Sequence, residues 1–167
     1  MVLAALSLAA GPTPALTAPQ QAELLADSAY SGTLLQRIRE SKRRIICAFY
    51  LFKVGERTDN LPARVVSELL QARRRGVDVT VILDGGKEVG RENLSAAGPL
   101  TRGGVRVVIP GGRRVNHLKA VLIDDRYVMI GSHNLTHAAL ARNREVSVLL
   151  DSPPLAAQVR RYLEGIR

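Results

Sequence analysis

Four polar side chains flank two apolar segments at spacings that suit the binding of a phosphate group. The stretch NHLKAVLIDDRYVMIGSHNL, residues 116–135, has His117 and Lys119 at its start and Ser132 and Asn134 near its end. An imidazole can act as a nucleophile or a general acid, while an ammonium, a hydroxyl and an amide can hold the oxygens of an anion. This set of groups points to phosphate chemistry that needs no metal and no other cofactor.

The two apolar segments are predicted to form a β-hairpin that brings these groups to one place. Side chains alternate between the two faces of a strand, so His117 and Lys119 point the same way. If residues 125–126 form a two-residue loop, His117 lies opposite Asn134 and Lys119 lies opposite Ser132. A four-residue loop shifts the pairs but keeps the faces. All four polar groups are therefore expected on one face of the hairpin.

The spacing of these residues resembles the signature of the phospholipase D superfamily. The pattern H-x-K-x4-D-x6-G-S-x-N is carried by His117, Lys119, Asp124, Gly131, Ser132 and Asn134. Similar proteins also carry a glutamate that orients the histidine, and Glu145 stands 13 residues after Ser132. The resemblance implies catalytic roles for His117, Lys119, Asp124 and Glu145, and phosphate binding by Lys119, Ser132 and Asn134. From its position alone, with the opposite parity at the end of a strand, Asp124 is instead expected to hold a turn or a salt bridge.

The resemblance implies a reaction that uses two histidines, and this bears on the number of subunits. In the resembled enzymes one histidine attacks phosphorus to form a phosphohistidine, and a second protonates the leaving oxygen, which predicts a bell-shaped pH profile. This sequence has one H-x-K segment. His133 has the wrong parity for the patch, and His137 falls in a following helix without a paired lysine. The second histidine must then come from a second copy, which predicts a homodimer with one shared active site, as in similar bacterial endonucleases.

The charge of the chain indicates a polyanionic substrate. The net charge is +9, with 24 basic residues of which 20 are arginine, and arginine suits bidentate contacts with phosphate. Arg113 and Arg114 precede the motif, and Arg142 and Arg144 lie near Glu145, so both pairs are candidates for contacts with a nucleic-acid backbone. The leading hypothesis is a metal-independent phosphodiesterase acting on nucleic acid. The alternatives are a phospholipase or phosphatidyl transferase acting on membrane lipid, and a binding module without catalysis.

The pattern of apolar residues predicts an α/β fold with a mixed β-sheet sandwiched between helices, and the resemblance implies a phospholipase D-like domain. Helices are expected within residues 31–44, 61–76, 91–102, 135–142 and 155–166. Strands are expected at residues 45–52, 77–83, 105–109, 118–123, 127–130 and 145–150. The one cysteine, Cys47, falls in the first of these strands, where it is expected to be a buried apolar residue.

The first 20 residues are expected to stand apart from a single domain formed by residues 21–167. Their apolar run, followed by small residues and prolines, resembles a signal peptide but lacks basic residues at its start. Two interpretations stay open, a signal peptide and a disordered leader. The first implies a periplasmic or secreted protein, and the second implies a cytoplasmic one.

Overall fold

The computed structural model describes residues 21–56, 60–112 and 114–167, so the predicted leader and Arg113 lie outside the described residues. A seven-stranded mixed sheet runs through the molecule in the order β1-β7-β6-β5-β2-β3-β4. The strands are β1 (Gln21–Ala26), β2 (Arg44–Phe49), β3 (Asp78–Leu83), β4 (Arg106–Val108), β5 (Lys119–Ile123), β6 (Tyr127–Gly131) and β7 (Val146–Asp151). The helices are α1 (Ala29–Glu40), α2 (Leu61–Arg74), α3 (Gly90–Arg102), α4 (His137–Ala141) and α5 (Pro153–Glu164).

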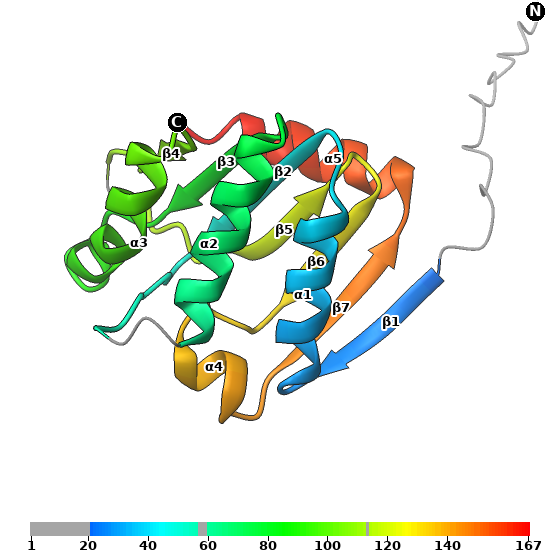
Figure 1. Cartoon of the computed structure of the whole chain (residues 1–167), viewed down its shortest axis with the longest axis horizontal. Coiled ribbons are helices and arrows are strands. Elements are labelled where there is room, and N and C mark those ends of the chain that lie inside the picture. Colours follow the sequence, from blue (N-terminus) through cyan, green and yellow to red (C-terminus); the bar gives the residue numbers. More distant parts are fainter. Residues whose placement is uncertain (1–20, 57–59, 113) are drawn as a thin grey trace, which may run out of the picture.

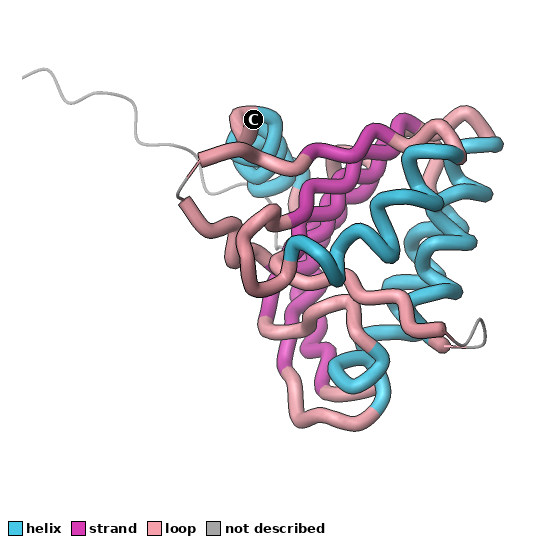
Figure 2. The backbone as a smooth tube through the Cα atoms, turned by 90° about the vertical axis from the view of Figure 1, so that its left-hand side faces the viewer, coloured by secondary structure: helices cyan, strands magenta, loops and turns pink. Residues whose placement is uncertain are grey.

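Helices cover both faces of the sheet, as the sequence predicted. The helices α1 to α4 pack on one face, where Leu34, Leu69, Leu100 and Leu140 join a large apolar cluster. The helix α5 packs on the other face, where Ala156 and Leu163 meet a smaller cluster over the centre of the sheet. Figure 1 shows α1, α2 and α3 in front of the strands and α5 behind them, and Figure 2 shows the same layers from the side. The α/β sandwich is confirmed.

The direction of β5 decides where the polar groups of the motif lie. The strands β2, β3 and β4 are parallel to one another, whereas β5 is antiparallel to β2. The start of β5 therefore lies next to the carboxyl ends of β2 and β3. We call this row of strand ends the edge of the sheet. The end of β6 and the start of β7 reach the same edge, because β5, β6 and β7 pair in antiparallel order.

The predicted register of the hairpin is wrong by one residue. The structure pairs Ala120 with Ile130 and Ile123 with Tyr127, so three residues, not two, form the loop. Two of them, Asp124 and Asp125, adopt a left-handed backbone with φ of 55°, which an aspartate tolerates better than most residues. A three-residue loop reverses the predicted parity, so the ladder does not place Ser132 opposite Lys119.

One strand is absent from the prediction. The strand β1 is the outermost strand on one side of the sheet and pairs along its whole length with β7. Its residues are exposed except Leu25, so its sequence shows little of the apolar pattern on which strand prediction depends. The predicted domain boundary at residue 21 coincides with the first residue that the structure describes, and its role as a boundary stays a prediction.

Every helix in the described part of the chain is too short or too polar to cross a membrane. Cys47 is fully buried in β2, and burial raises the pKa of its thiol to about 12. The thiol therefore stays protonated at neutral pH, in agreement with the expected structural role.

Two glycines make a matched test of the packing at the edge of the sheet. A side chain at Gly131 would overlap the backbone of Val146 and the side chain of Ser147, whereas one at Gly32 in α1 would meet open space. We expect Gly131→Ala to lower the free energy of unfolding by roughly 1–3 kcal/mol. Gly32→Ala should raise it by roughly 0.5–1 kcal/mol, since alanine favours a helix. Urea denaturation measures both, and an unchanged stability of Gly131→Ala would contradict the packing described.

Candidate active site

His117 and Lys119 lie side by side at the start of β5, as the sequence predicted. The Nζ atom of Lys119 is 3.3 Å from Nε2 of His117 and 3.5 Å from Nδ1. His117 is exposed and Lys119 is half-buried. The two distances are nearly equal, so the ammonium lies against the imidazole ring. A cation beside an exposed imidazole can hold the oxygens of a phosphate that the imidazole attacks.

Tyr50 supports the imidazole and was not foreseen from the sequence. Its ring lies 4.7 Å from the ring of His117, and the Nζ atom of Lys119 is 5.4 Å from the centre of the Tyr50 ring. The hydroxyl of Tyr50 donates to Glu88 at 2.8 Å, and this bond raises the pKa of Tyr50. The available signal was topological: Tyr50 follows β2, whose carboxyl end lies next to the start of β5.

Ser132 and Glu145 form a second pair at the same edge. The hydroxyl of Ser132 donates to Oε2 of Glu145 at 2.5 Å and accepts from the backbone N–H of Val146 at 3.1 Å. The other carboxylate oxygen of Glu145 accepts from Asn143 at 3.2 Å. The backbone N–H of Ser132 also donates to the carbonyl of Val146 at 2.9 Å, which keeps Ser132 beside the start of β7.

The electrostatic effect of Glu145 connects the two pairs. Burial lowers the pKa of Lys119 below that of a free lysine, and the negative charge of Glu145 offsets part of this effect. Glu145 thus favours the charged lysine that a phosphate requires. The resemblance implied that this glutamate orients the histidine. In the structure the side chain of Glu145 bonds to Ser132 and Asn143, and His117 contacts Tyr50 and Lys119.

A buried histidine and a turn hold Glu145 in place. Asp27, between β1 and α1, bonds to both backbone groups of Glu145: its N–H donates to the carbonyl, and its carboxylate accepts from the N–H, each at 2.9 Å. The fully buried His133 contacts the carbonyl of Asp27 at 2.9 Å and the hydroxyl of Ser147 at 2.7 Å, and its ring stacks on Tyr30. His133 is therefore structural. His137 begins α4 and is exposed, as expected.

A second buried network fixes the segment that carries His117. The carboxylate of Asp84, just after β3, accepts from the backbone N–H of Asn116 at 2.6 Å. The fully buried Asn93 of α3 bonds to the carbonyls of Asp84 and Tyr50 and to the N–H of Phe52, at 2.7–2.9 Å. These bonds join the ends of β2 and β3 to α3. Asp84 and Asn93 could not be identified from the sequence, because their hydrogen-bond partners are brought near only by the fold.

Asn134 lies at the same edge, next to the extension of β2. The following residue, Leu135, exchanges backbone hydrogen bonds with Leu51 and Lys53 at 2.9 and 3.0 Å. The side-chain oxygen of Asn134 is buried and has no hydrogen-bond partner among the described residues. An acceptor in that state favours a donor from a ligand or a water. Phosphate binding by Asn134 remains a prediction.

Asp124 lies at the far end of β5, away from His117 and Lys119. Its carboxylate accepts from three consecutive backbone N–H groups, those of Lys42, Arg43 and Arg44, at 2.8–3.2 Å. These bonds fix the turn that leads from α1 into β2. The geometry agrees with the structural role expected from its position and brings Asp124 into no contact with the other motif residues.

The residues brought together at this edge could bind and attack a phosphate ester. Among the described residues, no three histidine, cysteine, aspartate or glutamate side chains are grouped closely enough to hold a metal ion. The groups that these residues supply are an imidazole, an ammonium, a hydroxyl and a carboxylate.

A comparison with known families assigns the chain. Residues 34–167 match the family described as cardiolipin synthase, PLD-like domain. The chain belongs to this phospholipase D-like family. The matched residues include His117, Lys119, Ser132 and Glu145. They do not include β1, the outermost strand of the sheet.

Relatives of the phospholipase D-like chain include longer proteins. Cardiolipin synthase B of Salmonella typhi is 30% identical over 135 residues, which cover 79% of this chain and 31% of that protein. A phospholipase D of Rickettsia conorii is 32% identical over 94 residues, or 56% of this chain and 46% of that protein. The chain thus spans about a third of the length of the cardiolipin synthases that it matches.

Two solved structures share the fold over nearly their whole length. Nuc of Salmonella typhimurium, a phospholipase D family member, superposes with a TM-score of 0.76 at 23% identity, covering 87% of this chain and 93% of that one. NucT of Helicobacter pylori gives 0.73 at 18% identity, with 89% and 96% covered. The predicted family and the predicted phospholipase D-like fold are both confirmed.

Asp124 allows a structural role to be separated from a catalytic one. Asp124→Ala removes the acceptor of three N–H groups and strains a left-handed backbone, so we expect a loss of about 2–4 kcal/mol in the free energy of unfolding. Asp124→Asn keeps an acceptor and tolerates the backbone, so its loss should be smaller. Both variants should retain the turnover of the folded wild type on a phosphodiester substrate. A stable Asp124→Asn protein without turnover would instead assign Asp124 to the catalytic set.

Proposed function

We propose that the chain is a phosphodiesterase that hydrolyses nucleic acid without a metal ion, through a covalent phosphohistidine. The observation that carries the proposal is the pairing of His117 with Lys119 beside the Ser132–Glu145 pair at one edge of the sheet. It supplies a nucleophile and a cation in contact, together with a polar group on a neighbouring strand end.

In the proposed reaction His117 and a second histidine each act in two steps. A ring nitrogen of His117 forms a bond to phosphorus, and the bond from phosphorus to the leaving oxygen breaks. The second histidine gives its proton to that oxygen. In the second step the same histidine takes a proton from water, the water oxygen bonds to phosphorus, and the bond to His117 breaks. Lys119 stabilises the negative oxygens throughout. Asn134 acts as a further donor, and so does Ser132 once its hydroxyl turns from Glu145 to the phosphate.

The second histidine is proposed to be His117 of another copy of the chain. His133 is fully buried with both ring nitrogens in contact with polar groups, and His137 lies on α4. A two-fold axis beside the exposed His117 would place two imidazoles across one phosphate.

Nucleic acid is proposed as the substrate on the basis of charge. The net charge of +9 favours a polyanion, and Arg114 is exposed three residues before His117. The second candidate is the same reaction on a phospholipid. It is favoured by the 30% identity to cardiolipin synthase B and the 32% identity to a phospholipase D. In both cases His117 and Lys119 would act on a phosphodiester in the same way.

Cleavage in the presence of EDTA tests the reaction and the substrate together. We expect the wild type to cut plasmid DNA or RNA with EDTA present, because the cations of the site are side chains. His117→Ala should lower the rate at least a hundredfold, and His137→Ala, the matched control, should leave it unchanged. Release of headgroup from phosphatidylglycerol vesicles, without any cutting of nucleic acid, would contradict the proposed substrate and show that the enzyme acts on phospholipid.

Mixed dimers test the shared site. Chains with two different affinity tags, one wild type and one His117→Ala, are co-expressed and the heterodimer is purified through both tags. A site that needs two copies of His117 predicts almost no turnover by the heterodimer. Two independent sites would leave about half of the wild-type rate, and a fully active monomer would also contradict the proposal.

A further inference from the structure

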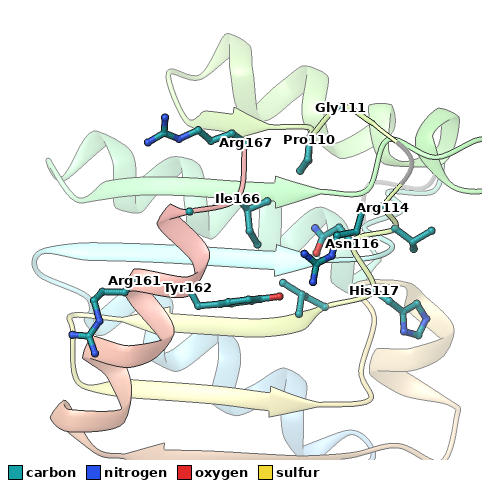
Figure 3. Close-up of a pocket in the computed structure, with 12 residues that line it drawn as sticks. Pro110, Gly111, Arg114, Asn116, His117, Arg161, Tyr162, Ile166 and Arg167 are labelled. Atoms are coloured by element: carbon teal, nitrogen blue, oxygen red, sulfur yellow. The ribbon is translucent and has the colours of Figure 1, made fainter.

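A groove lies next to the candidate active site, between the segment that leads into β5 and the last turns of α5. It has a volume of about 730 Å³, within the range of ligand sites. Figure 3 shows Tyr162 lying across the groove, with its hydroxyl end directed toward the segment of Asn116 and His117. The ring of His117 points away from the groove, beyond that segment. The groove therefore runs up to the candidate nucleophile from the α5 side.

The lining of the groove combines an apolar floor with positive charge. Leu118, Ile166 and the ring of Tyr162 supply apolar surface, and Tyr162 is 55% exposed. Arg114 lies on one side, and Arg161 and Arg167 lie on the side of α5. None of the three arginines forms an ion pair within residues 21–56, 60–112 and 114–167, and no acidic side chain from these ranges lines the groove. Such a lining attracts an anion that also carries an apolar surface.

The amide of Asn116 adds a polar group at the end of the groove nearest His117. Its nitrogen and oxygen are both buried, and neither has a hydrogen-bond partner among the described residues. The residue is 9% exposed and is held through its backbone by Asp84. An amide presents one donor group and one acceptor, and a buried amide without a partner favours pairing with a water or with a ligand group that reaches it.

We propose that this groove binds an unpaired nucleotide next to the phosphate that is cut, with its base stacked on Tyr162 and its backbone phosphate paired with Arg114. The inference rests on the proposed function, because it assigns the substrate of the same site. An aromatic face can stack on a base only when that base is unpaired, so the groove selects single strands.

The distribution of charge favours a strand over a phospholipid. A single lipid phosphate held by His117 and Lys119 would leave the arginines of the groove without an anion. A nucleic-acid strand brings one phosphate per nucleotide, so its backbone supplies an anion to the active site and to Arg114 at once. The apolar floor then meets a base, and the strand runs from the groove to the edge of the sheet.

Binding measurements on an inactive protein test the groove independently of catalysis. A fluorescent single-stranded oligonucleotide is titrated against His117→Ala protein, and against the same protein with Tyr162→Ala, Tyr162→Phe or Arg114→Gln. Loss of the stacked ring should weaken binding about tenfold, whereas phenylalanine keeps the stack and should restore it. Arg114→Gln should lower the salt slope of binding by about 0.7, the value for one phosphate contact in a single strand. Arg74→Gln, on the other side of the sheet, should change neither quantity.

A strand with abasic sites separates stacking from a structural effect. The His117→Ala protein, which keeps Tyr162, should bind the abasic strand about tenfold more weakly than it binds the intact strand. Adding Tyr162→Ala should weaken binding of the abasic strand no further. Equal losses with intact and abasic strands would overturn the proposal. So would a change from dimer to monomer in Tyr162→Ala, which would make the groove a subunit interface, or a loss confined to phosphatidylglycerol vesicles.

Turnover of a small substrate distinguishes failure of the groove from failure of the proposed function. Dimethyl phosphate contains the phosphodiester but no ring that could stack on Tyr162. In an active protein, Tyr162→Ala should raise the KM for the oligonucleotide about tenfold and leave kcat/KM for the small substrate within twofold. Equal losses on both substrates would overturn the groove proposal alone. A wild type inactive on both would overturn the proposed function, while the binding titration would still decide the occupant of the groove.

Discussion

The antiparallel placement of β5 beside β2 is the constraint on which the site depends. Had β5 run parallel to β2, His117 would lie at the opposite edge of the sheet from Tyr50. The inverted strand brings the polar start of β5 to the carboxyl ends of β2 and β3, and the core does not have to bury these groups. The apolar stretch Ala120–Ile123 fixes the strand in the sheet, with every side chain buried. The end of the strand can then carry charge at the surface.

The polar residues that support this edge are buried, except Asp27. Asn93 and Asp84 tie the segment of His117 to α3 and β3, while Asp27 and His133 hold the backbone beside Glu145. Each of these groups is paired with a backbone atom, which a buried polar group needs in order not to destabilise the fold. Side chains that face a substrate thus rest on a rigid frame, and rigidity of this kind lowers the cost of reorganisation during a reaction.

Much of the fold could be predicted from the sequence, because the apolar runs at β2, β3, β5 and β6 are strong and the helices have clear periodicity. The strand β1 could not, since its exposed residues give little signal. The motif located His117 and Lys119, but the assumed two-residue loop gave the wrong register. Two aspartates in left-handed conformations lengthen that loop to three residues. Tyr50, Asp27 and Asn93 were missed because their roles come from contacts between segments that are distant in the sequence.

The proposed reaction requires that His117 becomes covalently bonded to phosphorus in a site that two chains share. Rapid quenching of the wild type during turnover of bis(p-nitrophenyl) phosphate, followed by mass spectrometry of its peptides, measures this directly. We expect an acid-labile p-nitrophenyl phosphoryl group on the peptide that contains His117, at no more than one group per two chains. An adduct on another residue, or steady turnover with no adduct at any quench time, would contradict it.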